Sequence, residues 1–370
     1  MQYQLIFEQP RLEAYLAELA DGPLAIDTEF VRTRTYYPQL GLFQIYDGHQ
    51  LALIDPLAVD MSPLWKILGE PGRLSVLHAS GEDLELIQHE AGHLPALMHD
   101  TQLAAAFLGY GVSVGFGALV KDFLGVELVK DQARTDWLAR PLSPRQLDYA
   151  AADVFYLVPL YRQVMARLAE SGKLAWFEEE CRSHCARKVA ISDPYQAYLD
   201  IGNAWQLGRR ELAILRELAA WRQQEAVRRD LAVNFVVKEL HLYKVAERRP
   251  ASLRDLNELG LLPIEIKIHG KRLLDIVAKA QAGDPQLWPE RIRRLVDFPQ
   301  YKGELKRIKA LVEEKSKECG VPPELIASKK TIHQYFTWSW RLSEAERAAL
   351  EPPALLTGWR RELVGHLLQE

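Results

Sequence analysis

The chain contains 370 residues, which is more than one compact domain of ordinary size holds, so we expect two or three domains. Hydrophobic residues make up 48% and charged residues 26% of the chain, which excludes a disordered or collagen-like protein. The three cysteines are too few for a disulfide framework, and the sequence has neither a long apolar run nor a secretory signal pattern. We therefore expect a cytoplasmic protein with reduced thiols.

The formal net charge of −4 conceals two halves of opposite sign. Residues 1–170 hold 12 Lys and Arg against 22 Asp and Glu, whereas residues 171–370 hold 34 against 28. This asymmetry is typical of a protein whose basic part binds a polyanion. The carboxylates of the acidic half are candidates for binding divalent cations.

The first half alternates strand-like and helical patterns, which indicates an α/β domain. We expect strands at residues 3–7, 23–30, 42–46, 51–54 and 74–77, and helices at residues 10–20, 81–90, 101–108 and 115–124. A further helix begins with a capping box, in which Ser143 is the N-cap, Pro144 the first helical residue and Gln146 the third. We expect this helix to continue at least to Leu157.

Beyond residue 170 only helical patterns remain, so the second half is predicted to be all-α. Its apolar positions match one another at an offset of about 90 residues. For example, Leu215, Leu218 and Trp221 align with Leu305, Ile308 and Leu311. Either two repeated helical units or a chance similarity between amphipathic helices explains this match. Gly283-Asp284-Pro285 would separate the two copies.

Asp27 and Glu29 are the first candidate site residues. They follow an apolar run with one residue between them, so both carboxylates project from one face of a strand. A hard cation such as Mg²⁺ or Mn²⁺ would relieve their repulsion. Taken alone, the pair could also be a solvated strand end.

Two further motifs add carboxylates. Asp83 lies in the first turn of the helix that follows the strand at residues 74–77, where an aspartate can also serve the helix dipole without any other function. Tyr149 and Asp153 share one face of the capped helix, although such pairs are often simple surface contacts. Four carboxylates and one phenol in this order are more specific than any single pair.

These motifs resemble those of the ribonuclease D family, within the DEDD superfamily of 3′-to-5′ exonucleases that carry a tyrosine in the third motif. The resemblance covers nearly the whole chain through residues 27–30, 32–41, 78–84, 100–102, 134–138 and 149–153. It implies an α/β fold, in which a ribonuclease-H-like domain with a mixed sheet precedes two all-α HRDC (helicase and ribonuclease D C-terminal) domains. The implied boundaries are residues 1–170 for the exonuclease domain, 171–205 for a helical linker, 206–285 for the first HRDC domain and 286–370 for a second, degenerate one.

The resemblance also implies a reaction. Asp27, Glu29, Asp83 and Asp153 would hold two divalent metal ions, Mg²⁺ or Mn²⁺, and Tyr149 would orient the attacking water. Asp27 would bridge the two ions, Glu29 and Asp153 would complete the site on the nucleophile side, and Asp83 would serve the other ion. The expected products are 5′-mononucleotides from RNA 3′ ends, with tRNA precursors and other small structured RNAs as substrates. We expect a monomer without a protein partner and without membrane association.

A wider set of side chains is expected to contact RNA. It comprises His78, Lys130, Arg134 and Trp137 near the active site and Arg209, Arg210, Arg228, Arg229, Lys271 and Arg272 in the basic half. His78 could instead cap a strand end, and Trp137 could pack beneath the last helix of the first domain. Each basic side chain of the second half could equally belong to a solvated helix face.

Two other functions remain open from the sequence. A DNA 3′-to-5′ exonuclease would use the same two-metal chemistry, since cleavage of the phosphodiester does not require a 2′-hydroxyl. A nucleic-acid-binding module that lacks catalysis would retain the basic half. A zinc site at Cys181-x-x-His184-Cys185 is rejected because no fourth ligand stands at a recognisable spacing.

Overall fold

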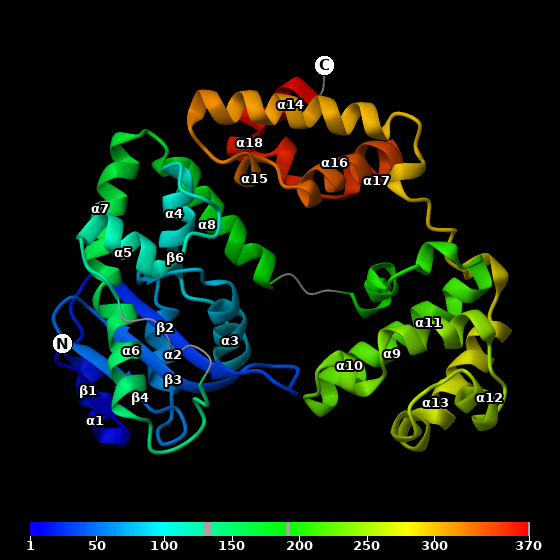
Figure 1. The fold of residues 1–370 in the computed structure, drawn as a ribbon, viewed down its shortest axis with the longest axis horizontal. Helices are drawn as coiled ribbons and strands as arrows, with labels where there is room; N and C mark the ends of the chain where they lie inside the picture. Colours follow the sequence, from blue (N-terminus) through cyan, green and yellow to red (C-terminus); the bar gives the residue numbers. More distant parts are fainter. Residues whose placement is uncertain (129–134, 190–192, 369–370) are drawn as a thin grey trace. The chain divides into compact units, whose positions relative to one another are not determined.

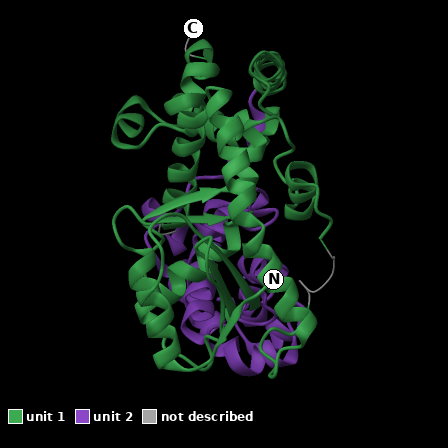
Figure 2. Cartoon of the chain, turned by 90° about the vertical axis from the view of Figure 1, so that its left-hand side faces the viewer, with its two compact units in different colours: residues 1–31, 39–190, 299–370 green, residues 32–38, 191–298 purple. Residues whose placement is uncertain are grey.

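The structure is a computed structural model that describes residues 1–128, 135–189 and 193–368. It divides the chain into two compact units, which Figure 2 distinguishes by colour. Unit 1 comprises residues 1–31, 39–190 and 299–370, and unit 2 comprises residues 32–38 and 191–298. No helix within the described ranges combines the length and the apolar character needed to cross a lipid bilayer.

Unit 1 is built on a six-stranded mixed sheet with the strand order β1-β4-β3-β2-β5-β6 (Figure 1). The strands are β1 (Gln4–Ile6), β2 (Leu24–Val31), β3 (Gln39–Tyr46), β4 (Leu51–Ile54), β5 (Leu74–Leu77) and β6 (Leu97–Asp100). β3 is antiparallel to both of its neighbours, β2 and β4, whereas the other three pairs are parallel. β4 is buried along its whole length, which explains why it consists of apolar residues alone.

Between residues 1 and 189 of the same unit, eight described helices alternate with or follow the strands. These are α1 (Gln9–Ala17), α2 (Ser62–Leu68), α3 (Gly81–Ala91), α4 (Thr101–Phe107), α5 (Phe116–Leu124), α6 (Pro144–Phe155), α7 (Leu157–Glu170) and α8 (Leu174–Val189). The prediction of an α/β domain is therefore confirmed. The sequence patterns missed α2 and β6.

Helix α6 begins at the expected capping box. The backbone N–H of Gln146 donates to Ser143 Oγ at 3.3 Å, and the backbone N–H of Ser143 donates to Gln146 Oε1 at 2.9 Å. The helix ends at Phe155. The prediction that it continues to Leu157 was therefore wrong. Pro159 accounts for the interruption, because it lacks an N–H and its ring conflicts with the carbonyl group four residues earlier. α7 then continues the chain as a separate helix.

Unit 2 is helical throughout its described residues, as predicted for the second half. Its main helices are α9 (Arg209–Arg229), α10 (Val233–Val236), α11 (Glu239–Arg248), α12 (Leu253–Glu258) and α13 (Pro263–Ala282). Their core contains Leu215, Leu218 and Leu242. Residues 32–38 belong to this unit because the backbone N–H groups of Tyr36 and Tyr37 each donate to Asp230 Oδ1 at 3.0 Å.

The C-terminal helices belong to unit 1. They are α14 (Tyr301–Cys319), α15 (Pro323–Ile326), α16 (Lys329–Arg341), α17 (Glu344–Ala349) and α18 (Gly358–Leu363). α15 and α16 begin 90 residues after α10 and α11, and the order of long, short and intermediate helices is the same in both sets. The helix order thus repeats at the offset seen in the sequence, although α18 has 6 residues where α13 has 20.

Helix α18 packs against α8 through a buried ion pair. The Arg360 guanidinium pairs with the Glu180 carboxylate, whose side chain is 4% exposed, and also donates to two backbone carbonyl groups. The fully buried Trp359 donates its indole N–H to Glu180 at 3.2 Å. Gly358 has a φ of +49°, and a Cβ atom at this position would overlap the Glu179 carboxylate. The positive φ therefore favours glycine where the two helices meet.

Candidate active site

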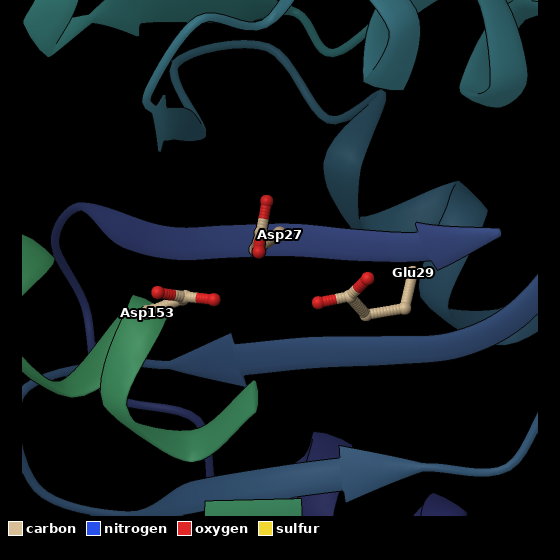
Figure 3. Close-up of side chains that lie close together, drawn as sticks. All are labelled: Asp27, Glu29 and Asp153. Carbon is tan, nitrogen blue, oxygen red and sulfur yellow. The ribbon is translucent and has the colours of Figure 1, made fainter. Parts of the chain in front are cut away.

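Strand β2 brings Asp27 and Glu29 to the sheet face that α6 covers. Ala25 on the same face packs into the cluster that contains Ala150 and Ala151 of α6, so residues 27 and 29 point toward this helix as well. One oxygen each of Asp27, Glu29 and Asp153 lie within 4.8 Å of one another. Figure 3 displays the three carboxylates gathered beside β2.

Helix α6 contributes Asp153 and Tyr149, which are one helical turn apart. The Tyr149 hydroxyl donates a hydrogen bond to the Asp153 carboxylate, as the i, i+4 spacing predicts. The Tyr149 ring lies beside the Trp137 ring, with 6.4 Å between the ring centroids. The phenol is therefore directed at the acidic group from a packed position.

Asp83, in the first turn of α3, lies next to these three carboxylates but outside their 4.8 Å group. Its Oδ1 accepts a hydrogen bond of 2.5 Å from Thr28 Oγ1 of β2. Among the charged neighbours of Asp27, Asp83 has the largest effect on the Asp27 pKa. The structure thus brings all four predicted carboxylates into one region, with Asp83 somewhat apart from the rest.

Burial raises the pKa of every carboxyl group in this region. It is the main reason that the pKa of Asp27 lies well above its usual range, and repulsion from Asp83, Asp153 and Glu29 adds to the effect. Burial likewise raises the pKa of Glu29 to about 9, that of Asp153 to about 7 and that of Asp83 to about 6. No lysine or arginine of the described chain acts on these four groups strongly enough to offset the effect. Among the described residues, the carboxylates of this region are therefore not balanced by a neighbouring cation.

Gln44 of β3 lies beside Asp27, and the sequence analysis did not single it out. It is the cross-strand partner of Asp27, and its side chain is fully buried. Neither Gln44 Oε1 nor Gln44 Nε2 has a hydrogen-bond partner within the described residues. A buried polar group without a hydrogen-bond partner lowers the stability of the folded protein. Oxygen atoms, such as that of the Gln44 carboxamide, are the ligands that Mg²⁺ and Mn²⁺ prefer. Gln44 stands alone in an apolar strand, so no sequence motif could have identified it.

Asp100 fixes the turn that leads into α3. Its carboxylate accepts hydrogen bonds from the backbone N–H groups of Ala79, at 3.0 Å, and Ser80, at 2.8 Å. Ala79 is held there at a φ of +58°, a conformation that is unfavourable for alanine. Asp100 also caps α4 by accepting from the N–H of Gln102 at 2.8 Å. In this way it positions the start of the helix that carries Asp83.

The side chains predicted to contact RNA near the active site have different environments. The His78 ring nitrogens lie 2.9 Å from Thr101 Oγ1 and 3.1 Å from the carbonyl oxygen of Val114, so both are engaged within the protein. Trp137 is fully buried, which corrects the prediction that its indole stacks on RNA and supports the packing alternative. Lys130 and Arg134 lie outside the described residues.

Four of the six basic residues predicted to bind RNA in unit 2 have acidic partners. Arg209 pairs with Glu290, both Arg228 and Arg229 pair with Glu225, and Arg272 pairs with Asp275. Arg210 and Lys271 are exposed and form no ion pair in the part of the chain that the structure describes. They remain the candidates of this set whose charge has no acidic partner among the described residues.

Comparison with known proteins supplies a family for each region of the chain. Residues 3–169 match a family described as 3′-5′ exonuclease, residues 211–277 match the HRDC domain, and residues 299–368 match the family described as ribonuclease D, C-terminal HRDC domain. The chain is 46% identical to ribonuclease D of Musicola paradisiaca over 374 residues, which cover 100% of this chain and 98% of the relative. It is also 46% identical to ribonuclease D of Escherichia coli over 376 residues, which cover 100% and 99%.

The crystal structure of Escherichia coli RNase D, described as an exoribonuclease involved in structured RNA processing, matches with a TM-score of 0.95. The match covers 100% of this chain and 98% of that chain at 46% identity. Similarity of this extent in sequence and fold, with the predicted carboxylates gathered in the matching exonuclease region, shows that the chain belongs to the ribonuclease D family of 3′-to-5′ exoribonucleases.

Proposed function

We propose that this exoribonuclease trims 3′ extensions from tRNA precursors and other small structured RNAs and releases 5′-mononucleotides. It acts as a monomer in the cytoplasm. The observation that carries the proposal is the convergence of Asp27, Glu29 and Asp153 within 4.8 Å, with Asp83 beside them and Tyr149 on the same helix as Asp153.

Two divalent ions, Mg²⁺ or Mn²⁺, suit this set of four carboxylates. Asp27 would serve both ions, because Glu29 and Asp153 lie close to it in one group and Asp83 lies outside that group. When bound, the ions supply stabilisation of the charge at the scissile phosphate and lower the pKa of the attacking water. The absence of cationic side chains around the carboxylates supports this assignment, since nothing else within the described residues neutralises them.

Tyr149 orients the attacking water. Burial raises the pKa of its phenol above the ordinary value, and Asp153, Glu29 and Asp27 raise it further. The phenol therefore stays protonated near neutral pH, where it acts through hydrogen bonds and not as a general base. Its contact with Trp137 keeps the ring in place while the hydroxyl faces the carboxylates.

The proposed division of labour follows the domains. Residues 1–170 carry the chemistry, residues 171–205 link the domains, and residues 206–285 and 286–370 form the two HRDC domains that hold RNA. In the first HRDC domain, Arg210 and Lys271 are exposed and have no ion partner among the described residues. They are therefore the favoured contacts to RNA phosphates. His78, Arg209, Arg228, Arg229 and Arg272 are weaker candidates, because their polar groups are already engaged.

A single assay tests this function. Purified protein is incubated with a 3′-extended tRNA and with matched single strands of RNA and DNA, in Mg²⁺, in Mn²⁺ and in a chelator, and the product length is followed. We expect stepwise shortening of the extension that stops near the stem, release of mononucleotides, and no reaction in the chelator. Asp27→Ala, checked for folding by circular dichroism, is expected to be inactive. Equal rates on the RNA and DNA strands would contradict the proposed preference for RNA.

A further inference from the structure

Thr28 lies between the two carboxylates of β2 in the sequence but on the other face of the sheet. Side chains alternate along a strand, so Thr28 points away from the face that Asp27 and Glu29 share. The residue is buried, with 5% of its surface exposed. Thr28 is therefore not placed to bind a cation beside these carboxylates or to contact a substrate.

The end of β5 leaves room for Asp83 beside β2. The pairing of β2 with β5 extends as far as Ala25, which lies opposite Val76, and β5 ends at the next residue. β2 continues beyond this point, and α3 begins after the turn that follows β5. Asp83, in the first turn of α3, thus interacts with β2 on both of its faces, with Thr28 through a hydrogen bond and with Asp27 through charge.

The contact with Thr28 directs the Asp83 carboxylate. Thr28 Oγ1 donates to Asp83 Oδ1 at 2.5 Å, within the range of strong hydrogen bonds between a hydroxyl and a carboxylate. Burial raises the pKa of Asp83, and the Thr28 hydrogen bond is the largest of the effects that lower it. The contact therefore favours the ionised carboxylate, which is the form that binds a cation. Because Oδ1 is engaged, the other oxygen is the one left for a metal ion.

We propose that Thr28 is a positioning residue, which holds the Asp83 carboxylate so that its Oδ2 binds the second metal ion. This inference rests on the proposed function with two ions. Asp83 lies outside the group formed by Asp27, Glu29 and Asp153, so its placement depends on a contact of its own. Hydrogen bonds to carboxylate ligands fix their orientation, and loss of such a partner typically weakens metal binding about 10- to 100-fold.

The test compares variants of the full-length chain with and without the hydroxyl. Thr28→Val removes the hydroxyl and keeps a β-branched side chain that suits a strand, whereas Thr28→Ser keeps the hydroxyl. Ser75→Ala is the matched control, since Ser75 is fully buried on the neighbouring β5 and its hydroxyl has no hydrogen-bond partner within the described residues. Circular dichroism checks the fold of each variant. Thr28→Ala replaces the valine variant if that one does not fold.

Metal binding is the first measurement. Bound Mn²⁺ is counted from the electron paramagnetic resonance signal of the free ion, with 5′-adenosine monophosphate at a fixed concentration to supply a phosphate, and a titration without protein corrects for Mn²⁺ held by the nucleotide. We expect Thr28→Val to bind one ion as the wild type does and the other about 10- to 100-fold more weakly. Thr28→Ser and Ser75→Ala should both behave as the wild type. Unchanged binding by Thr28→Val, or an equal loss of both ions, would overturn the inference.

The dependence of the rate on Mg²⁺ is the second measurement. For Thr28→Val, the Mg²⁺ concentration that gives half of the maximal single-turnover rate should rise about 10- to 100-fold, while the rate at saturating Mg²⁺ approaches that of the wild type. A loss of folded protein would lower the maximal rate instead. Wild-type protein that binds fewer than two ions, or releases no nucleotide from RNA, would refute the proposed function. Two bound ions and hydrolysis in the wild type, with Thr28→Val indistinguishable from it, would refute the role of Thr28 alone.

Discussion

Asp27 is surrounded by groups that oppose its ionisation. Burial, Asp83, Asp153 and Glu29 all act in the same direction, and the backbone hydrogen bond that involves Thr28 only partly offsets them. A carboxylate is stable in such surroundings only as a neutral acid or as the ligand of a cation. The metal-free site is therefore a strained arrangement of acids, and its properties are the basis for the predictions at the scale of single residues.

Replacement of Tyr149 by phenylalanine is expected to separate metal binding from turnover. The ring and its contact with Trp137 are retained, whereas the hydroxyl that orients water is lost. We expect a single-turnover rate at least about tenfold below that of the wild type, with unchanged affinity for Mg²⁺ measured by calorimetry. An unchanged rate would show that the phenol has no part in positioning the water.

Gln44→Met is expected to stabilise the metal-free protein. The carboxamide is fully buried and its two polar atoms lack partners within the described residues, so an apolar side chain of similar size should raise the free energy of unfolding by about 1 kcal/mol. Chemical denaturation in a chelator measures this change. Leu42→Met is the matched control, since Leu42 is equally buried on the same strand and already apolar. If Gln44→Met destabilised the protein more than Leu42→Met does, the Gln44 carboxamide would have a hydrogen-bond partner even without metal.

Sequence motifs drew attention to the four carboxylates because each belongs to a recognisable local pattern. Asp27 and Glu29 follow an apolar run, Asp83 opens a helix after a strand, and Asp153 follows a capping box. Gln44 could not be found in this way, because its importance arises from strand pairing with Asp27, which is a contact between distant positions. Burial of Trp137 was likewise open from sequence, since the same residue suits a core or a stacking surface.

Among the elements, the contact between α8 and α18 depends most on a few polar groups. Glu180 is buried, which opposes its ionisation, but hydrogen bonding and charge from Arg360 hold the pKa of Glu180 below its usual value. Gly358 and Arg360 of α18 lie at this contact. Their role at α8 was not predictable, because the partner residues Glu179 and Glu180 lie in a different part of the chain.

Glu180→Ala is expected to lower the free energy of unfolding by about 3 to 5 kcal/mol, because the Arg360 charge and the Trp359 indole N–H would both remain buried without their acceptor. Urea unfolding measures the loss. Glu180→Leu/Arg360→Met replaces the pair with apolar side chains and should recover most of it. Glu304→Ala, which breaks the exposed pair with Arg307 on α14, is the control and should change stability by less than about 1 kcal/mol. Equal effects of Glu180→Ala and the control would contradict a structural role for the buried pair.

For the molecule as a whole, local patterns predicted the classes of structure better than the associations between distant segments. The α/β first half, the all-α second half and the repeated helix order follow from hydrophobic periods and caps, which are local properties. The grouping of residues 299–370 with the exonuclease domain in one unit was not predicted, and neither was the grouping of residues 32–38 with residues 191–298. Such groupings depend on contacts like those of Trp359 and Asp230, which join segments more than a hundred residues apart.

The last prediction concerns the stability of the whole protein against pH. The folded pKa values of Asp83, Asp153 and Glu29 lie at about 6, 7 and 9, above the ordinary values near 4 that these groups take in the unfolded chain. Between about pH 4 and pH 9 the folded protein therefore binds more protons at these groups than the unfolded chain does. Stability without metal is therefore highest below pH 4 as far as these groups are concerned, and it is lost as the pH rises toward 9.

We accordingly expect the melting temperature in a chelator to fall between pH 6 and pH 9, because folding then holds ionised carboxylates close together. Mg²⁺ binds the ionised form, so the stabilisation that it provides should grow over the same range. Differential scanning calorimetry with chelator and with Mg²⁺ at several pH values measures both trends. Asp27→Asn/Glu29→Gln/Asp153→Asn removes the like charges and should flatten the metal-free profile and abolish the effect of Mg²⁺. A metal-free melting temperature that rises over this range in the wild type, with the variant unchanged in profile, would contradict the proposed electrostatic strain at the site.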